Sequence, residues 1–162
     1  MQKMTFSERT ITSEPRAGEK IKVEVPTWVN GTLRFDSGAI ATLFTTFDVW
    51  YHQESLMEIY GTEGTMIVPN PDFFDGPVML FDRDSETYKE YPICFDHPGD
   101  ARGLGLSDLA DAVIHSRAPR ASSVQGLHAL EIMSGIISSA ELGREVKMQT
   151  PYTRPDPMPE AK

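Results

Sequence analysis

Apolar and polar residues begin to alternate with a period of two at Ile21, and short strand-like runs follow up to about residue 95. From Ile21 to Val25, apolar side chains alternate with Lys22 and Glu24, and Pro26 ends the pattern. This alternation is typical of a half-buried β-strand. Further strands are predicted over residues 29–35, 38–47, 55–60, 65–68, 78–81 and 87–91. Because Gly, Pro and Asp clusters separate these runs, we expect consecutive strands to pair as an antiparallel meander.

Two of the connections have the composition of tight turns. Asp36-Ser37, followed by Gly38, joins the 29–35 and 38–47 runs, and a turn from Gly61 to Gly64 leads into the 65–68 run. Glycine takes a positive φ without a clash from Cβ, whereas a proline in a strand cannot donate a ladder hydrogen bond. Both segments therefore predict β-hairpins.

The period changes to that of a helix in the last third of the chain. Apolar residues recur at helical spacing in two stretches: Leu106, Leu109, Ala110 and Val113, then Leu127, Leu130, Ile132, Met133, Ile136, Ile137 and Ala140. Ser107 is the expected N-cap of the first helix, which ends within residues 115–119. Ser122 or Ser123 caps the second helix, and Gly143 suits its C′ position.

Strands followed by helices, rather than alternating with them, predict the α+β class, here an open antiparallel sheet with two C-terminal helices packed on one face. Residues 1–20 are polar and are expected to form an N-terminal loop or an edge strand. A single α+β domain is expected over 21–149, with a return strand at 145–149. Residues 150–162 are a proline-rich tail, expected as an extended arm or a disordered end.

The strand predicted over 38–47 carries no charge on either face. An antiparallel strand with one face in water normally alternates apolar with strongly polar residues, so this strand is expected to be covered on both sides. The helices cover one side, and we expect the other to meet another subunit or domain. The predicted interface residues are Trp28, Thr32, Arg34, Thr42 and Phe44. A central strand covered by loops is the alternative.

Charge and composition narrow the function classes. The net charge of -9 repels a phosphate backbone and the 15 basic residues are scattered, so nucleic acid is not an expected partner. No run approaches the roughly 18 apolar residues of a membrane span, and the N-terminus lacks the apolar stretch of a secretory signal. A lone Cys94 gives no intrachain disulfide. A cytoplasmic location is therefore expected.

Two polar loops are candidate substrate sites. Residues 96–102 gather carboxylates with His97 and Arg102, which can bracket hydroxyls or a carboxylate; a solvated connection is the alternative. Residues 48–52 place Trp50 and His52 just beyond a strand, and aromatic faces stack on sugar rings; an interface or a core rim is the alternative.

Other motifs fail as sites. The segment 103–108 begins like a dinucleotide fingerprint, but Asp108 replaces the third glycine and no strand precedes it, so no cofactor-binding residue is predicted. No two histidines are spaced as zinc ligands, and the His128–Glu131 pair, at i,i+3, is expected to lie in solvent. Cys94 has apolar neighbours that raise a thiol pKa. No catalytic or metal-binding residue is predicted.

The segments 58–78, 38–42 and 102–110, with Arg120-Ala121-Ser122, together resemble the C-terminal domain of the glucose-fructose oxidoreductase and inositol dehydrogenase family. The resemblance runs from about Arg9 to Lys147 and rests on the order of the motifs, since no single one is diagnostic. It implies an open antiparallel sheet with helices on one side. It also implies that the sheet contributes to oligomer contacts and that the domain closes a substrate pocket beside a nicotinamide cofactor.

Family members also carry an N-terminal dinucleotide-binding domain with a Glu-Lys-Pro lysine, and an acid and a histidine near the start of the second domain. None has a counterpart here, since Ile21 follows Glu19-Lys20. The sequence is therefore expected to begin inside the second domain, and to bind no cofactor by itself, with NAD or NADP implied for a complete enzyme. The expected partners are a second copy, through the open sheet face, and a dinucleotide-binding domain or chain.

The function expected from the resemblance is that of the substrate-binding and oligomerisation half of an NAD(P)-dependent sugar or polyol dehydrogenase, which does not transfer hydride alone. A stand-alone dimerisation or small-molecule-binding module without enzymatic activity is the alternative.

Overall fold

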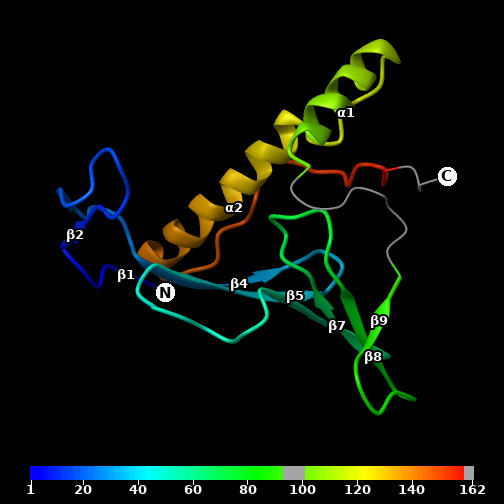
Figure 1. Ribbon diagram of the computed structural model, residues 1–162, viewed down its shortest axis with the longest axis horizontal. Coiled ribbons are helices and arrows are strands. Elements are labelled where there is room, and N and C mark those ends of the chain that lie inside the picture. Colours follow the sequence, from blue (N-terminus) through cyan, green and yellow to red (C-terminus); the bar gives the residue numbers. More distant parts are fainter. Residues whose placement is uncertain (93–100, 159–162) are drawn as a thin grey trace. The chain divides into compact units, whose positions relative to one another are not determined.

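A computed structural model describes residues 1–92 and 101–158 of the chain (Figure 1). The chain divides into two compact units. The first combines residues 1–52 with residues 124–152, and the second combines residues 53–123 with the chain from Thr153 onward. The single domain expected over 21–149 stays a prediction.

The main sheet of the first unit has three antiparallel strands in the order β1-β4-β5. They are β1 (Gln2–Lys3), β4 (Trp28–Arg34) and β5 (Ile40–Thr46). The β4–β5 hairpin confirms the predicted one, with Trp28 opposite Thr46 at one end and Arg34 opposite Ile40 at the other. Its turn needs Gly38, which has a φ of 91°.

A second, two-stranded sheet in this unit pairs β2 (Glu8–Thr10) with β3 (Lys20–Lys22). The strand predicted from Ile21 to Val25 therefore ends at Lys22, after which the chain turns toward β4. Within residues 1–20, β1 pairs along the edge of β4.

The first unit also contains nearly all of α2 (Ser123–Leu142). The helix begins directly after Ser122 and ends at Leu142, and Gly143, with a φ of 65°, confirms the predicted C′ glycine. The helix packs on β4, where a Cβ added to Gly31 would lie 3.0 Å from Ile136 Cγ2. This close approach needs a residue without a side chain at position 31.

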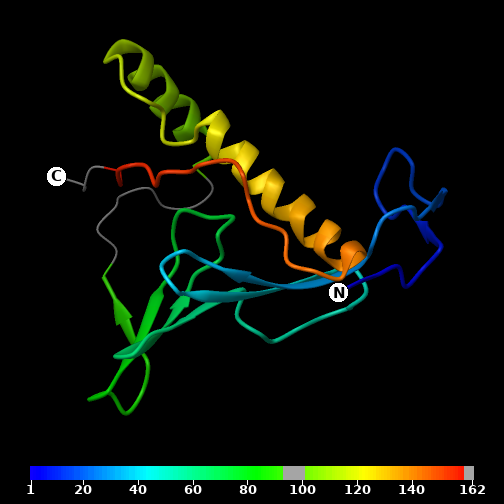
Figure 2. The same ribbon diagram turned by 180° about the vertical axis from the view of Figure 1, so that it is seen from behind.

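The chain after α2 runs back along the helix as an extended segment (Figure 2). Gly135 of α2 makes room for Met148, whose Cε would lie 2.6 Å from an added Cβ. The strand predicted at 145–149 is wrong, because the backbone there bonds to helix side chains in place of a sheet. The N–H groups of Gln149 and Thr150 donate to the carboxylate of Glu131, at 2.6 and 2.9 Å.

The second unit has a four-stranded antiparallel meander in sequence order. Its strands are β6 (Met57–Tyr60), β7 (Gly64–Val68), β8 (Val78–Asp82) and β9 (Lys89–Tyr91). The predicted turn between β6 and β7 is confirmed, with the Gly61 N–H donating to the Gly64 carbonyl at 2.8 Å. Gly64 also lies against β8, where an added Cβ would be 2.5 Å from the Phe81 carbonyl oxygen.

The helix of the second unit is α1 (Gly103–Ile114). Its N-cap is Arg102, so the N-cap predicted at Ser107 is wrong. The helix begins earlier because the Leu104 N–H already bonds to the Ala101 carbonyl, which places Ser107 inside the second turn.

The predicted α+β class with two C-terminal helices is confirmed. The described strands form three antiparallel sheets, however, where the sequence predicted one open sheet. Alternation identifies a strand and its exposed face but not its partner, which long-range packing selects. The helices α1 and α2 fall largely in different units.

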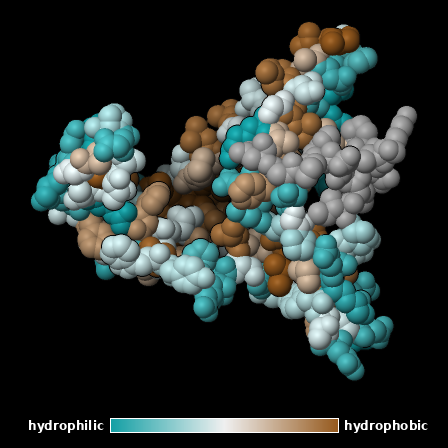
Figure 3. All heavy atoms as spheres, in the orientation of Figure 1, coloured by the Kyte–Doolittle hydropathy of each residue, from teal (hydrophilic) through white to brown (hydrophobic). Residues whose placement is uncertain are grey.

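Apolar side chains remain open to solvent in both units (Figure 3). On α1, Leu106, Val113 and Ile114 are each more than two thirds exposed. Buried apolar side chains are few among the described residues: Val23, Ala112 and Ile136. Contiguous exposed apolar surface of this kind marks contacts with other chains or domains.

Candidate functional site

The face of the β4–β5 hairpin that points away from α2 carries the predicted interface residues. Side chains alternate between the two faces of a strand, and directly paired residues share a face. Gly31 faces α2. The register therefore places Trp28, Thr32, Arg34, Thr42 and Phe44 together on the opposite face. We name this surface the β4–β5 face.

Aromatic and apolar side chains dominate one half of the β4–β5 face. The rings of Trp28 and Phe44 meet edge to face with centroids 5.6 Å apart, a contact that contributes about 0.5–1.5 kcal/mol beyond burial. Phe44 is 53% exposed and Ile40, on the same face, is 69% exposed. A large apolar area thus stays in water in the single chain.

The β4–β5 face carries a single charged side chain among the residues of its two strands, and that charge is paired. Arg34 donates to Glu145 at 2.6 Å, and both side chains are exposed. Thr32 and Thr42 lie opposite each other and are neutral. A partner therefore meets an apolar and hydroxyl-bearing surface without net charge.

The loop that follows β5 contains the first candidate substrate residues. Trp50 is fully exposed, and both Tyr51 and His52 are exposed. The base of the loop is fixed at Asp48, whose carboxylate accepts a hydrogen bond from the Thr27 hydroxyl at 2.8 Å. The Asp48 N–H donates to the Thr46 hydroxyl at 2.9 Å.

The neighbours of Asp48 lower the pKa of its carboxyl group. Hydrogen bonding to the side chains of Thr5 and Thr27, with the charge of Arg9, lowers the pKa of Asp48 below its usual value, although burial opposes the shift. The Arg9 guanidinium lies 3.5 Å from Asp48 Oδ1 and also donates to the Phe47 carbonyl. Polar contacts therefore hold the first two residues of the loop.

The structure does not bring the four candidate substrate residues into one described site. Trp50 and His52 belong to the first unit, whereas Arg102, at the start of α1, belongs to the second. His97 lies outside the described residues, as does Cys94. Their shared role in substrate binding stays a prediction.

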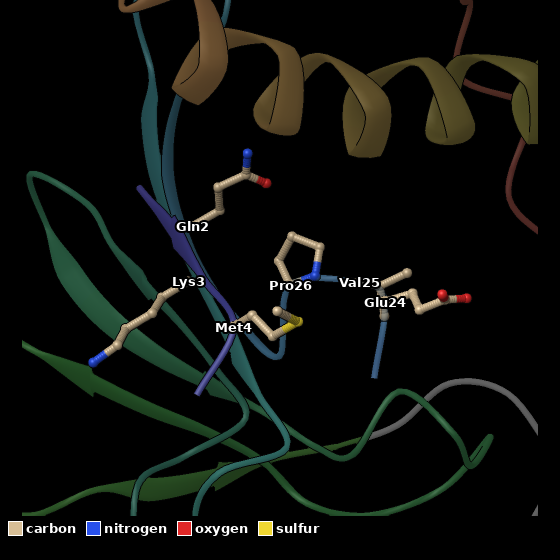
Figure 4. A pocket seen from close by; sticks show the side chains of 6 residues that line it. All are labelled: Gln2, Lys3, Met4, Glu24, Val25 and Pro26. Atoms are coloured by element: carbon tan, nitrogen blue, oxygen red, sulfur yellow. The ribbon is translucent and has the colours of Figure 1, made fainter. Parts of the chain in front are cut away.

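A surface hollow of about 320 Å³ lies beside β1, and no pattern in the sequence indicated it (Figure 4). Its lining residues are Gln2, Lys3, Met4, Glu24, Val25 and Pro26. Gln2 and Lys3 point to opposite sides of β1, and Gln2 Oε1 is buried without a hydrogen-bond partner. Because the hollow depends on β1 pairing with β4 across more than 20 residues, no local motif could predict it.

Asp108 forms an ionic cluster with Arg117 and Arg120, which the sequence analysis missed. The Asp108 side chain is 7% exposed, accepts from Arg117 at 2.6 Å and from the Arg120 N–H at 2.8 Å, and contacts the Arg120 guanidinium. Hydrogen bonds from Arg117 first, and then from Arg120, hold the pKa of Asp108 well below its usual range. Arg120 also donates to the carbonyls of Asp156 and Pro157.

The Asp108 cluster has a structural role. It joins α1 to the following turn and to part of the tail, all within the second unit. The sequence places Arg117 and Arg120 on either side of Pro119, after the aspartates of a predicted helix. The spacing of these residues does not reveal which carboxylate the two arginines bind.

The expectation that His128 and Glu131 lie in solvent is wrong. Both side chains are half-buried and fasten the segment after α2. His128 Nδ1 lies 2.9 Å from the Thr150 carbonyl, and its ring stacks on Tyr152 at 5.5 Å. Hydrogen bonds from the backbones of Gln149 and Thr150 lower the pKa of Glu131.

Two further kinds of feature, a membrane span and a metal site, concern residues 1–92 and 101–158. No helix there is both long and apolar enough to cross a membrane. The same residues contain no group of three or more His, Cys, Asp or Glu side chains placed to hold a metal ion.

Comparison with known proteins supports one family. Residues 4–67 match a family model described as the GFO/IDH/MocA C-terminal domain. Neither a curated protein nor a solved structure matches the chain. The matched residues begin just after β1, include β2 to β6 and continue into β7, so they include the whole β4–β5 face. Over these residues the chain is similar to a GFO/IDH/MocA C-terminal domain, which supports the family predicted from the sequence.

Proposed function

We propose that the chain is the oligomerisation and substrate-facing domain of an NAD(P)-dependent sugar or polyol oxidoreductase, and that the β4–β5 face binds a second copy of the chain. The observation that supports this most is that α2 covers one face of the β4–β5 hairpin, whereas the other face, the β4–β5 face, is exposed. The family resemblance implies a sheet of this kind in oligomer contacts.

The charges of the chain favour self-association through this face. Two copies each carry a net charge of -9, so they repel wherever acidic surfaces meet. The β4–β5 face avoids that repulsion, because Arg34 is paired with Glu145 and the remaining side chains are neutral. Burying an exposed aromatic or branched side chain such as Phe44 or Ile40 contributes about 1.5–3 kcal/mol.

The proposal leaves hydride transfer to a cofactor held elsewhere. It assigns NAD or NADP to a separate dinucleotide-binding domain or chain. It assigns a sugar or polyol to a pocket between that domain and this chain. The proposed substrate-contacting residues are Trp50, His52, His97 and Arg102. The competing function is a stand-alone dimerisation or small-molecule-binding module.

The oligomer part is tested by mass in solution, from light scattering across a concentration series. We expect an oligomer for the unmodified chain and a monomer for Phe44→Asp. Association would bury the aspartate carboxylate with no opposite charge to pair with it, which is unfavourable. Phe74→Asp is the matched control, since Phe74 is a similarly exposed phenylalanine in the second unit. A chain that remains monomeric at high micromolar concentration contradicts the proposal.

Calorimetric titration with NADH tests the assignment of the cofactor. We expect no tight binding to the isolated chain. Tight binding would contradict both the proposed function and the stand-alone alternative. Mixing with a dinucleotide-binding partner then separates the two functions, because only a dehydrogenase half restores cofactor-dependent oxidation of a polyol.

A further inference from the structure

Asparagine or aspartate precedes glycine at two places in the chain, Asn30-Gly31 and Asp75-Gly76. At such a pair the backbone nitrogen of the glycine can attack the side-chain carbonyl carbon of the preceding residue and close a succinimide ring. Glycine favours this attack because it has no side chain to obstruct the close approach of its backbone. A hydrogen bond that holds the glycine N–H prevents the attack, so the structure decides which of the two pairs reacts.

The main sheet of the first unit protects Asn30-Gly31. Both residues belong to β4, which is the central strand between β1 and β5. The Asn30 N–H donates to the Met1 carbonyl at 2.9 Å, on the β1 side. Because successive N–H groups of a strand point to opposite sides, the Gly31 N–H points to β5, where Leu43 is its paired residue. The close approach of Ile136 at Gly31 also leaves the strand little room to move.

Asp75-Gly76 has no such protection. The pair lies in the connection between β7 and β8, residues 69–77, and Asp75 is exposed. A turn closes the first part of this connection, where the Phe73 N–H donates to the Asn70 carbonyl at 3.1 Å. The Gly76 N–H, by contrast, donates to no acceptor in the part of the chain that the structure describes. Its nitrogen is therefore available for the attack.

We propose that Asp75 is a site of spontaneous isoaspartate formation in the folded chain, whereas Asn30 is protected. In the reaction, the Gly76 nitrogen forms a bond to the side-chain carboxyl carbon of Asp75 in its acid form. The carboxyl hydroxyl leaves as water with the proton from that nitrogen. Water then adds to the former backbone carbonyl of the ring, and its bond to nitrogen breaks. The product has the same atoms as aspartate, and nothing is oxidised or reduced.

Isoaspartate at this position would alter the connection that aligns β7 with β8. It lengthens the main chain by a methylene group and turns the former backbone carboxyl into a side group. Gly76 has a φ of 107°, and an added Cβ there would lie 2.8 Å from the Pro69 Cβ. A longer main chain at so tight a contact must separate Gly76 from Pro69. We therefore expect the two strands to open more readily after the change.

Peptide mapping by mass spectrometry tests the proposal on the full chain, incubated at neutral pH and physiological temperature. We expect the peptide with Asp75 to accumulate a form of the same mass and a different elution time. An isoaspartyl methyltransferase should transfer a methyl group to the new carboxylate of that form. The peptide with Asn30 should stay unchanged. Asp75→Glu should lose the signal, because the longer side chain keeps the charge but closes a ring far more slowly.

A parallel incubation in guanidinium chloride removes the protection that the fold gives. There the peptide with Asn30 should lose ammonia and gain a carboxylate, since the Gly31 nitrogen is no longer held in the sheet. Loss of ammonia from Asn30 at the same rate in the folded chain would overturn its protection by β4. If Asp75 reacts in denaturant but not in the folded chain, or reacts in neither, the proposed site is refuted. No part of this test depends on self-association or on a cofactor.

Hydrogen exchange measures the structural consequence. The aged chain is compared with fresh protein, and peptides that contain isoaspartate are separated by their elution time. We expect amides of β7 and β8 to exchange faster in chains with isoaspartate, while those of β4 and β5 serve as the internal reference. Equal exchange of β7 and β8 in aged and fresh chains would refute the effect on the connection.

Discussion

Replacing Gly31 with alanine tests the packing of α2 on the β4–β5 hairpin. A Cβ at position 31 would lie 3.0 Å from Ile136 Cγ2 and 3.5 Å from its Cγ1, whereas carbon atoms pack at about 3.5–4.0 Å. Ile136 cannot turn away easily, because a β-branched side chain in a helix has one preferred rotamer and this one is 9% exposed. The helix and the strand must therefore separate.

The magnitude follows from two opposing effects. Alanine in place of a strand glycine gains roughly 0.5–1 kcal/mol from the smaller entropy loss on folding. Overpacking a close contact costs about 1–3 kcal/mol. Because the contact involves a stiff, buried side chain, we expect Gly31→Ala to lower the free energy of unfolding by about 1–2 kcal/mol.

A double-mutant cycle with Ile136→Ala isolates the contact. That truncation alone costs about 2–5 kcal/mol through lost burial and a new cavity. In its background the alanine methyl enters space that Ile136 vacated, so Gly31→Ala should become neutral or stabilising. The coupling between the two positions should then reach about 1–3 kcal/mol.

Urea unfolding followed by circular dichroism measures each variant, with equal denaturant slopes as the condition for comparison. Gly126→Ala is the matched control, since an added Cβ there meets no atom within 4 Å. It should raise stability by up to about 1 kcal/mol through helix propensity. If the effects of Gly31→Ala and Ile136→Ala simply add, the two residues are not in contact and the packing argument fails.

Three further changes test other parts of the structure. Because the pKa of Asp108 is lowered in the folded chain, the stabilisation by its carboxylate is complete above the ordinary carboxyl pKa of about 4 and is lost as the pH falls through the lowered value. Asp108→Asn should therefore lower the melting temperature at neutral pH. A difference in melting temperature between the two proteins that persists unchanged into strong acid would contradict the ionic role. Glu131→Gln should speed hydrogen exchange, measured by NMR, at the backbone amides of Gln149 and Thr150, which donate to the Glu131 carboxylate, whereas Glu141→Gln on the same helix should not. Equal exchange at these amides in both variants would argue against the two hydrogen bonds. Gly64→Ala should destabilise the second unit by at least about 1–3 kcal/mol, because its Cβ would meet a backbone carbonyl at 2.5 Å, whereas Gly105→Ala, with open space around it, should be neutral or stabilising in urea unfolding.

Local chemistry made much of the fold predictable. The hairpin at Gly38 and the turn from Gly61 to Gly64 were found because each turn is specified by a few adjacent residues. The end of α2 was found for the same reason, since Gly143 takes a positive φ that few other residues tolerate. The predicted interface residues do share one face, because the period of a strand places them there.

Interactions between distant residues were not predictable in this way. The segment at 145–149 has the composition of a strand, yet Glu131 satisfies two backbone N–H groups at its end and no strand forms. In the sequence, Asp108 was considered only because it replaces the third glycine of a dinucleotide fingerprint. In the structure, two arginines make it the centre of an ionic cluster. In each case the partner lies 9 to 19 residues along the chain, beyond the few adjacent residues that a turn or cap pattern contains.

The sequence alone determined the α+β class, the hairpins and the uncharged character of β5, because these follow from periodicity and turn chemistry. The tertiary structure decided how the strands divide into sheets, which face of β5 meets α2, and how Thr27 and Arg9 anchor the loop that carries Trp50. The physical reason is that strand pairing and polar anchoring join residues far apart in the chain. Their free energy depends on geometry that exists only after folding.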